Sequence, residues 1–212
     1  MSELNQAELR EIALLRQKTT EMLEQVQAMF RTSFDGLMKN DIDTLNQVLE
    51  DEEKITGIYN SLTASAVESS KKNLLDEAKR IVVDLMDITC AIERIGDCCV
   101  DLVERIEYKI RENLLFSEAA VQEYKDLYSK VDQILSDTIK VMKNKDKKLA
   151  EKILENKPAL DLLVDKYRAS HIDRSAKGIC DEWARVRYLD MLDLTKEAAH
   201  YCMRIVGKLV EE

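Results

Sequence analysis

A row of apolar residues between positions 81 and 106 most constrains the fold of this chain. Successive members are separated by alternating steps of four and three residues: Ile81, Leu85, Ile88, Ile92, Ile95, Cys99, Leu102 and Ile106. This spacing places every member on one face of an α-helix, as in long helices that pack against other helices. The segment is therefore predicted to be a long helix inside a bundle.

The rest of the chain also favours helices. Its 212 residues contain a single proline, Pro158, and only five glycines, which are too few turn signals for a protein built of strands. Apolar residues recur at helical spacing from Leu4 to Gly36, and a second helix is predicted from about Ile42 to Ser69. A fourth is predicted to begin after Ser117, whose hydroxyl suits an N-cap. The predicted fold class is all-α.

Two stretches of the chain resemble each other. "LMKNDIDTLNQVLEDEEK", residues 37–54, is similar to "VMKNKDKKLAEKILENKP", residues 141–158, with Leu45 matched to Leu149. The chain is therefore predicted to contain two copies of one three-helix unit, residues 1–113 and 114–212, which together form one domain. Short links between long helices require antiparallel neighbours, so we expect two tandem antiparallel three-helix bundles in an elongated molecule.

The charge and the cysteines narrow the class of function. A formal net charge of -9 argues against nucleic acid as a partner, because phosphate backbones are bound by clustered Lys and Arg. The cysteines form no C-x-x-C pair and are expected to be reduced, buried side chains of a cytoplasmic protein: Cys90, Cys98, Cys99, Cys180 and Cys202. No apolar run reaches the ~20 residues that cross a bilayer, so we expect no transmembrane segment.

The stretch "AIERIGDCCVDLVERI", residues 91–106, carries a row of carboxylates. Glu93, Asp97 and Asp101 are spaced by four residues, so they lie on one helix face, and two of them could reach one cation. Hard oxygen ligands suit Mg, Ca, Mn or Fe. The other interpretation is a solvated acidic flank with Arg94 and Arg105 as counter-charges. Spacing leaves both interpretations open.

The same residues resemble a known family. "ERIGD", residues 93–97, is similar to the signature of PhoU-type domains, helical regulators of phosphate uptake, and "VLEDEEKITGIYNSL" is similar to the acidic second helix of that family. The duplicated plan is also shared. "ASHIDRSAKG" with "RVRYLDMLDLTKEAAHYCMRIV" resembles the end of PhoU-like domains associated with sodium/phosphate cotransporters. The resemblance extends from about Leu14 onward.

In that family, an E-x-x-x-D pair and acidic residues of the adjacent helix hold a multinuclear iron or other metal cluster. The resemblance therefore implies metal ligands at Glu93, Asp97 and Glu52, and Asp101, which stands where the family usually has Asn, is predicted as a fourth. Thr56 and Tyr59 also depart from the family pattern. In the second copy, Lys196 and His200 stand where Glu93 and Asp97 stand in the first. We expect a single metal site, for iron or for Mg, Mn or Ca, in the first copy.

No catalytic motif is present: the chain has no G-x-S-x-G, P-loop or H-E-x-x-H sequence, so an enzyme is not expected. The resemblance implies a regulatory protein of phosphate transport or phosphate homeostasis. It would act by contact with a membrane phosphate transporter, either a sodium/phosphate cotransporter or a transporter ATPase, in the cytoplasm at the inner face of the membrane. A homodimer is compatible with amphipathic helices.

Two other functions are open. Glu197 and His200 form an E-x-x-H, the ligand spacing of di-iron helical bundles, which would suit a metal-storing or metal-oxidising protein. A ligand-free helical adaptor is the third possibility. Trp183, the single tryptophan, is expected in the core or at an interface. Gly96 is expected to allow a close helix crossing, or space beside a metal.

Overall fold

The computed structural model of the chain describes residues 6–70 and 75–211. These residues form helices and short connections and contain no strand, which confirms the all-α prediction. The helices of this part are α1 (Gln6–Lys39), α2 (Ile42–Ser70), α3 (Asp76–Arg111), α4 (Glu118–Asn144), α5 (Lys147–Glu155), α6 (Lys157–Ala176) and α7 (Glu182–Glu211). The predicted first residue of the first helix, Leu4, and the outer ends of the two predicted repeats, Met1 and Glu212, lie outside the described residues.

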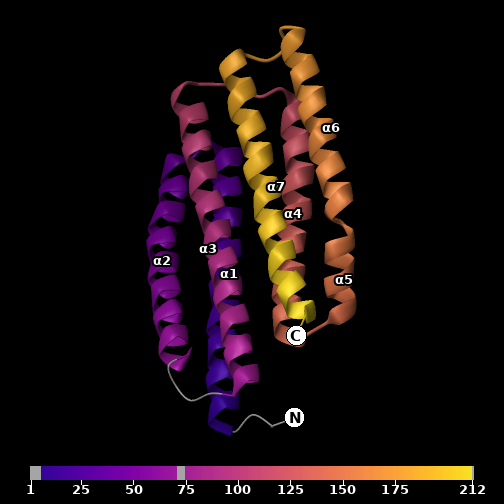
Figure 1. Ribbon diagram of the computed structural model, residues 1–212. Helices are drawn as coiled ribbons and strands as arrows, with labels where there is room; N and C mark the ends of the chain where they lie inside the picture. Colours follow the sequence, from indigo (N-terminus) through magenta and orange to yellow (C-terminus); the bar gives the residue numbers. More distant parts are fainter. Residues whose placement is uncertain (1–5, 71–74, 212) are drawn as a thin grey trace.

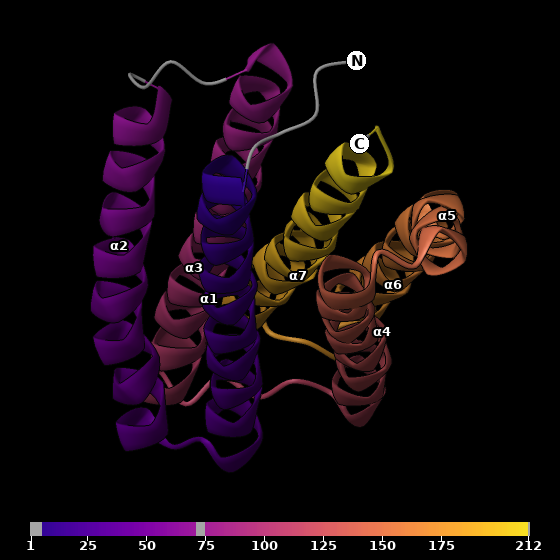
Figure 2. The ribbon, with the colours of Figure 1, turned by 90° about the horizontal axis from the view of Figure 1, so that it is seen from below.

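The helices form two antiparallel three-helix bundles side by side, as the sequence predicts. Figure 1 shows α1, α2 and α3 on one side and α4 to α7 on the other, with α2 and the α5–α6 pair outermost. The bundles meet where α3 packs on α7 and α1 packs on α4. Figure 2, seen from below, shows the same neighbours. None of the described helices combines the length and apolarity needed to cross a bilayer.

One helix of the second bundle is interrupted. Asn156 ends α5 and precedes α6, which carries Pro158 in its first turn. A proline lacks the backbone N–H and its ring clashes with the carbonyl four residues earlier, here that of Leu154. The helix therefore breaks just before it, and α5 and α6 together take the place that α2 has in the first bundle.

The apolar row on α3 forms the centre of the molecule. All its members are buried except Ile81, which is partly buried. They pack against α1 and α2 on one side and against α7 on the other. A fully buried side chain such as Ile92 contributes about 1.5–3 kcal/mol relative to an exposed one, so this row supplies much of the apolar burial.

The two turns after the Met-Lys-Asn sequences differ by one residue. Asn40 and Lys145 adopt left-handed backbone conformations, with φ of 51° and 53°. The next residue caps the following helix: the Asp41 carboxylate accepts a 3.0 Å bond from the Asp43 N–H, and Asp146 accepts one of 3.1 Å from the Leu149 N–H. The second copy thus has one extra residue before its cap. Buried Leu45 therefore corresponds to buried Ala150, and its predicted match to Leu149 is wrong by one residue.

The tight helix approach lies at a different glycine from the expected one. A Cβ added at Gly36 would lie 2.8 Å from Cγ of buried Leu45, so α1 and α2 approach closely there. A Cβ at Gly96 would meet Ile55 and Val26 methyl groups at 3.8 and 3.9 Å, which is ordinary van der Waals contact. The expected close crossing at Gly96 is therefore absent.

Candidate functional site

Three of the predicted metal ligands lie near one another on the first bundle. Glu93 and Asp97 are on α3, and Glu52 is on α2, which packs beside it. Partial burial raises the pKa of Glu93, and the negative charges of Asp97 and Glu52 raise it further. We call these three carboxylates, Glu52, Glu93 and Asp97, the acidic face.

Neighbouring donors already engage the acidic face. The Arg94 guanidinium donates a 3.0 Å hydrogen bond to Asp97 and lies 3.8 Å from Glu93. The Thr56 hydroxyl donates a 2.6 Å bond to Glu52. Thr56, one of the departures from the family pattern, thus acts as a hydrogen-bond partner of the predicted ligand on α2.

Asp101, the fourth predicted ligand, has a separate partner. Its carboxylate forms a 3.1 Å ion pair with Arg105 one turn along α3. Among the described residues, no group of three or more His, Cys, Asp or Glu side chains is placed to hold a metal ion. As the side chains lie, Thr56, Arg94 and Arg105 engage these carboxylates, so the metal cluster that the family resemblance implies would have to displace those donors.

The part of α7 that corresponds to Glu93 and Asp97 on α3 contains paired charges. Lys196 lies 3.8 Å from Asp193, and His200 Nε2 lies 2.8 Å from the Asp161 carboxylate on α6. Glu197 accepts a 3.3 Å hydrogen bond from the hydroxyl of Tyr201, one turn further along α7. The E-x-x-H residues thus have separate partners, and His200 joins α6 to α7.

A buried polar network joins α4, α6 and α7, and the sequence did not indicate it. The Arg174 guanidinium donates to both carboxylate oxygens of Glu123, at 2.9 Å for the Oε1 contact, and the two side chains are 13% and 17% exposed. The Tyr188 hydroxyl donates a 3.3 Å bond to the same carboxylate. A fully buried His171 stacks on Tyr188 with ring centroids 4.1 Å apart. We call these four residues the Glu123 network.

The histidine of this network is held neutral. Burial and the nearby positive charge of Arg174 lower the pKa of His171 to about 4. Arg174 has only donors, so it donates to His171 Nδ1, 3.4 Å away, and the imidazole proton lies on Nε2. That Nε2 is buried and has no hydrogen-bond partner among the described residues. Protonation of His171 would bury a second positive charge, so the neutral form is favoured.

Sequence spacing could not reveal this network because its members come from three helices. Glu123 follows the start of α4 by five residues, whereas Tyr188 lies 65 residues further along the chain. The segment "ASHIDRSAKG" carries both His171 and Arg174, but its charged fraction is no higher than the 34% of the whole chain, so it gave no signal. Only the packing of α6 on α7 shows that one face of this segment points inward.

Two comparisons find similarity to PhoU proteins, one in sequence and one in fold. The PhoU domain model matches residues 19–106, which extend from α1 to the last turns of α3. PhoU from Pseudomonas aeruginosa superposes with a TM-score of 0.87 at 14% identity, over 95% of this chain and 96% of that chain. The phosphate transport system regulatory protein PhoU from Streptococcus pneumoniae gives a TM-score of 0.84 at 16% identity, over 96% and 95%.

No curated protein matches the chain significantly by sequence. At such low identities the structural likeness shows the fold, while the family model carries the sequence relationship. The sequence match ends with the first bundle, and the structural match includes both. The PhoU-like resemblance is therefore confirmed, by sequence over residues 19–106 and by fold over nearly the whole chain.

Proposed function

We propose that this protein regulates phosphate transport by direct contact with a membrane phosphate transporter, either a sodium/phosphate cotransporter or a transporter ATPase. The observation that carries the proposal is the PhoU domain match over α1 to α3. It is supported by the fold shared with a phosphate transport system regulatory protein from Streptococcus pneumoniae. In this proposal the protein acts in the cytoplasm, at the inner face of the membrane, as a monomer or a homodimer.

We place the transporter contact at the end of the molecule where α6 turns into α7. Ile179 and Trp183 are 60% and 59% exposed there, and Val186 on the next turn of α7 is also exposed. The expectation that Trp183 packs in the core is wrong, which leaves the interface alternative. Exposed apolar residues with a tryptophan at their centre are typical of protein contact sites.

Charged pairs surround these apolar residues. Arg185 pairs with Glu182 at 3.2 Å, and Lys177 pairs with Asp173. The connection between α3 and α4, which carries the exposed Leu115, lies at the same end of the molecule (Figure 1). An apolar centre with a polar rim matches the usual anatomy of a reversible protein interface.

The test is phosphate uptake in cells that lack the gene and in cells that carry Trp183→Asp. We expect the deletion to alter uptake and Trp183→Asp to reproduce the deletion, with loss of copurification with the transporter. Leu162→Asp is the matched control, because Leu162 is an exposed leucine on α6 outside the proposed contact. Unchanged uptake in the deletion strain would refute the function. Normal uptake and copurification in Trp183→Asp would refute only the location of the contact.

We further propose that a metal ion modulates this contact by binding at the acidic face. The support is the position of Glu52 on α2 beside Glu93 and Asp97 on α3; burial raises the pKa of Glu93, and the charges of these two carboxylates raise it further. A cation would have to replace Arg94 as the partner of Asp97. Elemental analysis and metal titration should therefore show weaker binding in Asp97→Asn and stronger binding in Arg94→Gln. Equal metal content in the wild type, Asp97→Asn and Arg94→Gln would refute the modulation.

A further inference from the structure

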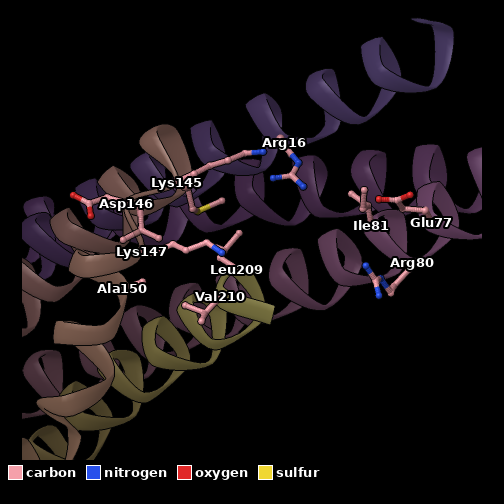
Figure 3. Close-up of a pocket in the computed structure, with 12 residues that line it drawn as sticks. Arg16, Glu77, Arg80, Ile81, Lys145, Asp146, Lys147, Ala150, Leu209 and Val210 are labelled. Atoms are coloured by element: carbon pink, nitrogen blue, oxygen red, sulfur yellow. The ribbon is translucent and has the colours of Figure 1, made fainter. Parts of the chain in front are cut away.

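A cavity opens between the two bundles at the end opposite to the α6–α7 turn. Its volume is about 250 Å³, and it lies where α3 and α5 begin and α4 and α7 end (Figure 3). Arg16 of α1 lines it as well, so both bundles contribute. Neither the PhoU signature residues nor the acidic face takes part in it.

The charged side chains of this cavity are mostly cationic. Arg16, Arg80, Lys145 and Lys147 come from four parts of the fold, and Figure 3 shows Lys145 and Lys147 on one side of the cavity and Arg80 on the other. Arg80, Lys145 and Lys147 form no ion pair with any residue of the described ranges, 6–70 and 75–211. This concentration of positive charge is notable in a protein with a formal net charge of -9.

Two carboxylates also line the cavity and do not cancel this charge. Glu77 lies in the first turn of α3, and Asp146 is engaged as the cap of α5, where it accepts from the Leu149 N–H. Two helices begin at the cavity and two end there, so their opposite terminal dipoles offset each other. Arg80, Lys145 and Lys147 thus outnumber the two carboxylates, which makes the local potential positive.

The floor of the cavity is apolar. Ile81, Met142 and Leu209 are partly buried side chains that line it, together with buried Val141 and Ala150. A bare inorganic anion would bind the cationic rim and leave this floor in contact with water. The volume lies near the lower limit of small-molecule pockets, which span roughly 300–1,000 Å³. The cavity is thus suited to a small ligand that carries both an anionic and an apolar group.

We propose that this cavity binds a soluble organic phosphate of about the size of a mononucleotide. Its phosphate group contacts Arg80, Lys145 and Lys147 at the rim, and its organic part covers Met142 and Leu209. Arginine and lysine are the side chains that bind phosphate oxygens most strongly, through charge-assisted hydrogen bonds. The proposal goes beyond the regulatory function above and does not depend on it.

The test is isothermal titration calorimetry with AMP, adenosine and inorganic phosphate as three probes. We expect AMP to bind, adenosine to give no measurable heat, and inorganic phosphate to bind at least about tenfold more weakly than AMP. Binding of AMP should weaken with added salt, because the contacts are between exposed charges. Equal affinity for AMP and adenosine, or for AMP and inorganic phosphate, would overturn the proposal.

Matched lysines on α5 provide the control. Lys147→Gln combined with Arg80→Gln should weaken AMP binding at least about tenfold. Lys148→Gln, which changes an exposed neighbour that does not line the cavity, should leave it unchanged. Circular dichroism melts will show that the exchanges at these exposed positions preserve the fold. Absent AMP binding, an equal effect of Lys148→Gln, or binding to phosphatidylglycerol vesicles without binding to AMP would each overturn the proposal.

Discussion

The two bundles of this protein share one architecture and differ in what their interiors contain. Inside α1 to α3, a 3.3 Å pair of buried hydroxyls, Thr19 and Thr89, lies among apolar side chains, and towards the start of α1 the buried Ser69 hydroxyl donates to Glu11. Inside α4 to α7 lies the Glu123 network, which includes an ion pair with little exposure to solvent. The same helical plan thus accommodates an interior centred on apolar side chains and one that contains a buried ion pair.

The surfaces of the two bundles also differ, in how their carboxylates are arranged. The acidic face on α2 and α3 gathers carboxylates, whereas the equivalent part of α7 pairs Lys196 and His200 with acids of their own. Because the apolar spacing is enough to keep helices in register, the second bundle could change both its surface and its interior without losing the fold. This explains why the PhoU sequence match ends at residue 106 while the structural match continues.

The largest effect should come from breaking the buried ion pair. Arg174→Ala leaves the Glu123 carboxylate with little exposure and without its charged partner, which should cost about 3 kcal/mol of unfolding free energy in urea denaturation. Arg94→Ala removes a more exposed arginine of the first bundle and should cost less than about 1 kcal/mol. Equal losses in the two variants would contradict the contrast between the bundles.

The second effect is a pH dependence that depends on His171. Its folded pKa of about 4 lies below the ordinary value of 6.5, so the unfolded chain binds the proton first as the pH falls. Stability should therefore be complete above pH 6.5 and decrease by on the order of 2 kcal/mol toward pH 4. Urea midpoints at pH 7 and pH 5 should show this slope in the wild type and in His200→Gln. A slope that persists in His171→Phe would show that another group is responsible.

Gly36→Ala tests the close approach of α1 and α2 in the first bundle. The added methyl group would collide with buried Leu45, so we expect a loss of about 1–3 kcal/mol in the free energy of unfolding. The corresponding position of the second bundle is the exposed Lys140, and Lys140→Ala should change stability by less than about 0.5 kcal/mol. A fully stable Gly36→Ala protein would mean that Leu45 can move aside.

The smallest effect is expected at Gly96. Its Cβ position has ordinary contacts, and alanine is favoured over glycine in a helix interior by up to about 1 kcal/mol. Gly96→Ala should therefore leave the thermal midpoint unchanged or raise it by a few degrees. A clear destabilisation would instead support the close crossing that the sequence suggested.

Regular spacing made much of the fold predictable. The apolar row from Ile81 to Ile106 and the Ser117 cap, which accepts from the Ala120 N–H, lie as expected. Pro158 was visible in the sequence. The break between α5 and α6 was not predicted, because no helix bounds were assigned around this proline. Spacing also brought Glu93 and Asp97 to one face of α3, yet it could not show that Arg94 would pair with them.

The remaining features depend on contacts between distant segments. The Glu123 network and the cationic cavity each combine residues from three or more helices, so no periodicity within one segment indicates them. Trp183 illustrates the same difficulty, since a single tryptophan is consistent with a core or with a surface and only packing shows its exposure.

Hydrogen exchange measured by mass spectrometry at pH 7 and pH 5, corrected for intrinsic exchange rates, tests the contrast between the bundles most directly. Because the pKa of His171 is about 4 in the fold and 6.5 when its surroundings open, a lower pH favours opening of the helices that bury it, so amides of α4, α6 and α7 should lose protection at pH 5 while those of α1 and α2 keep theirs. Equal loss of protection in both bundles, or loss confined to α1 and α2, would contradict the account.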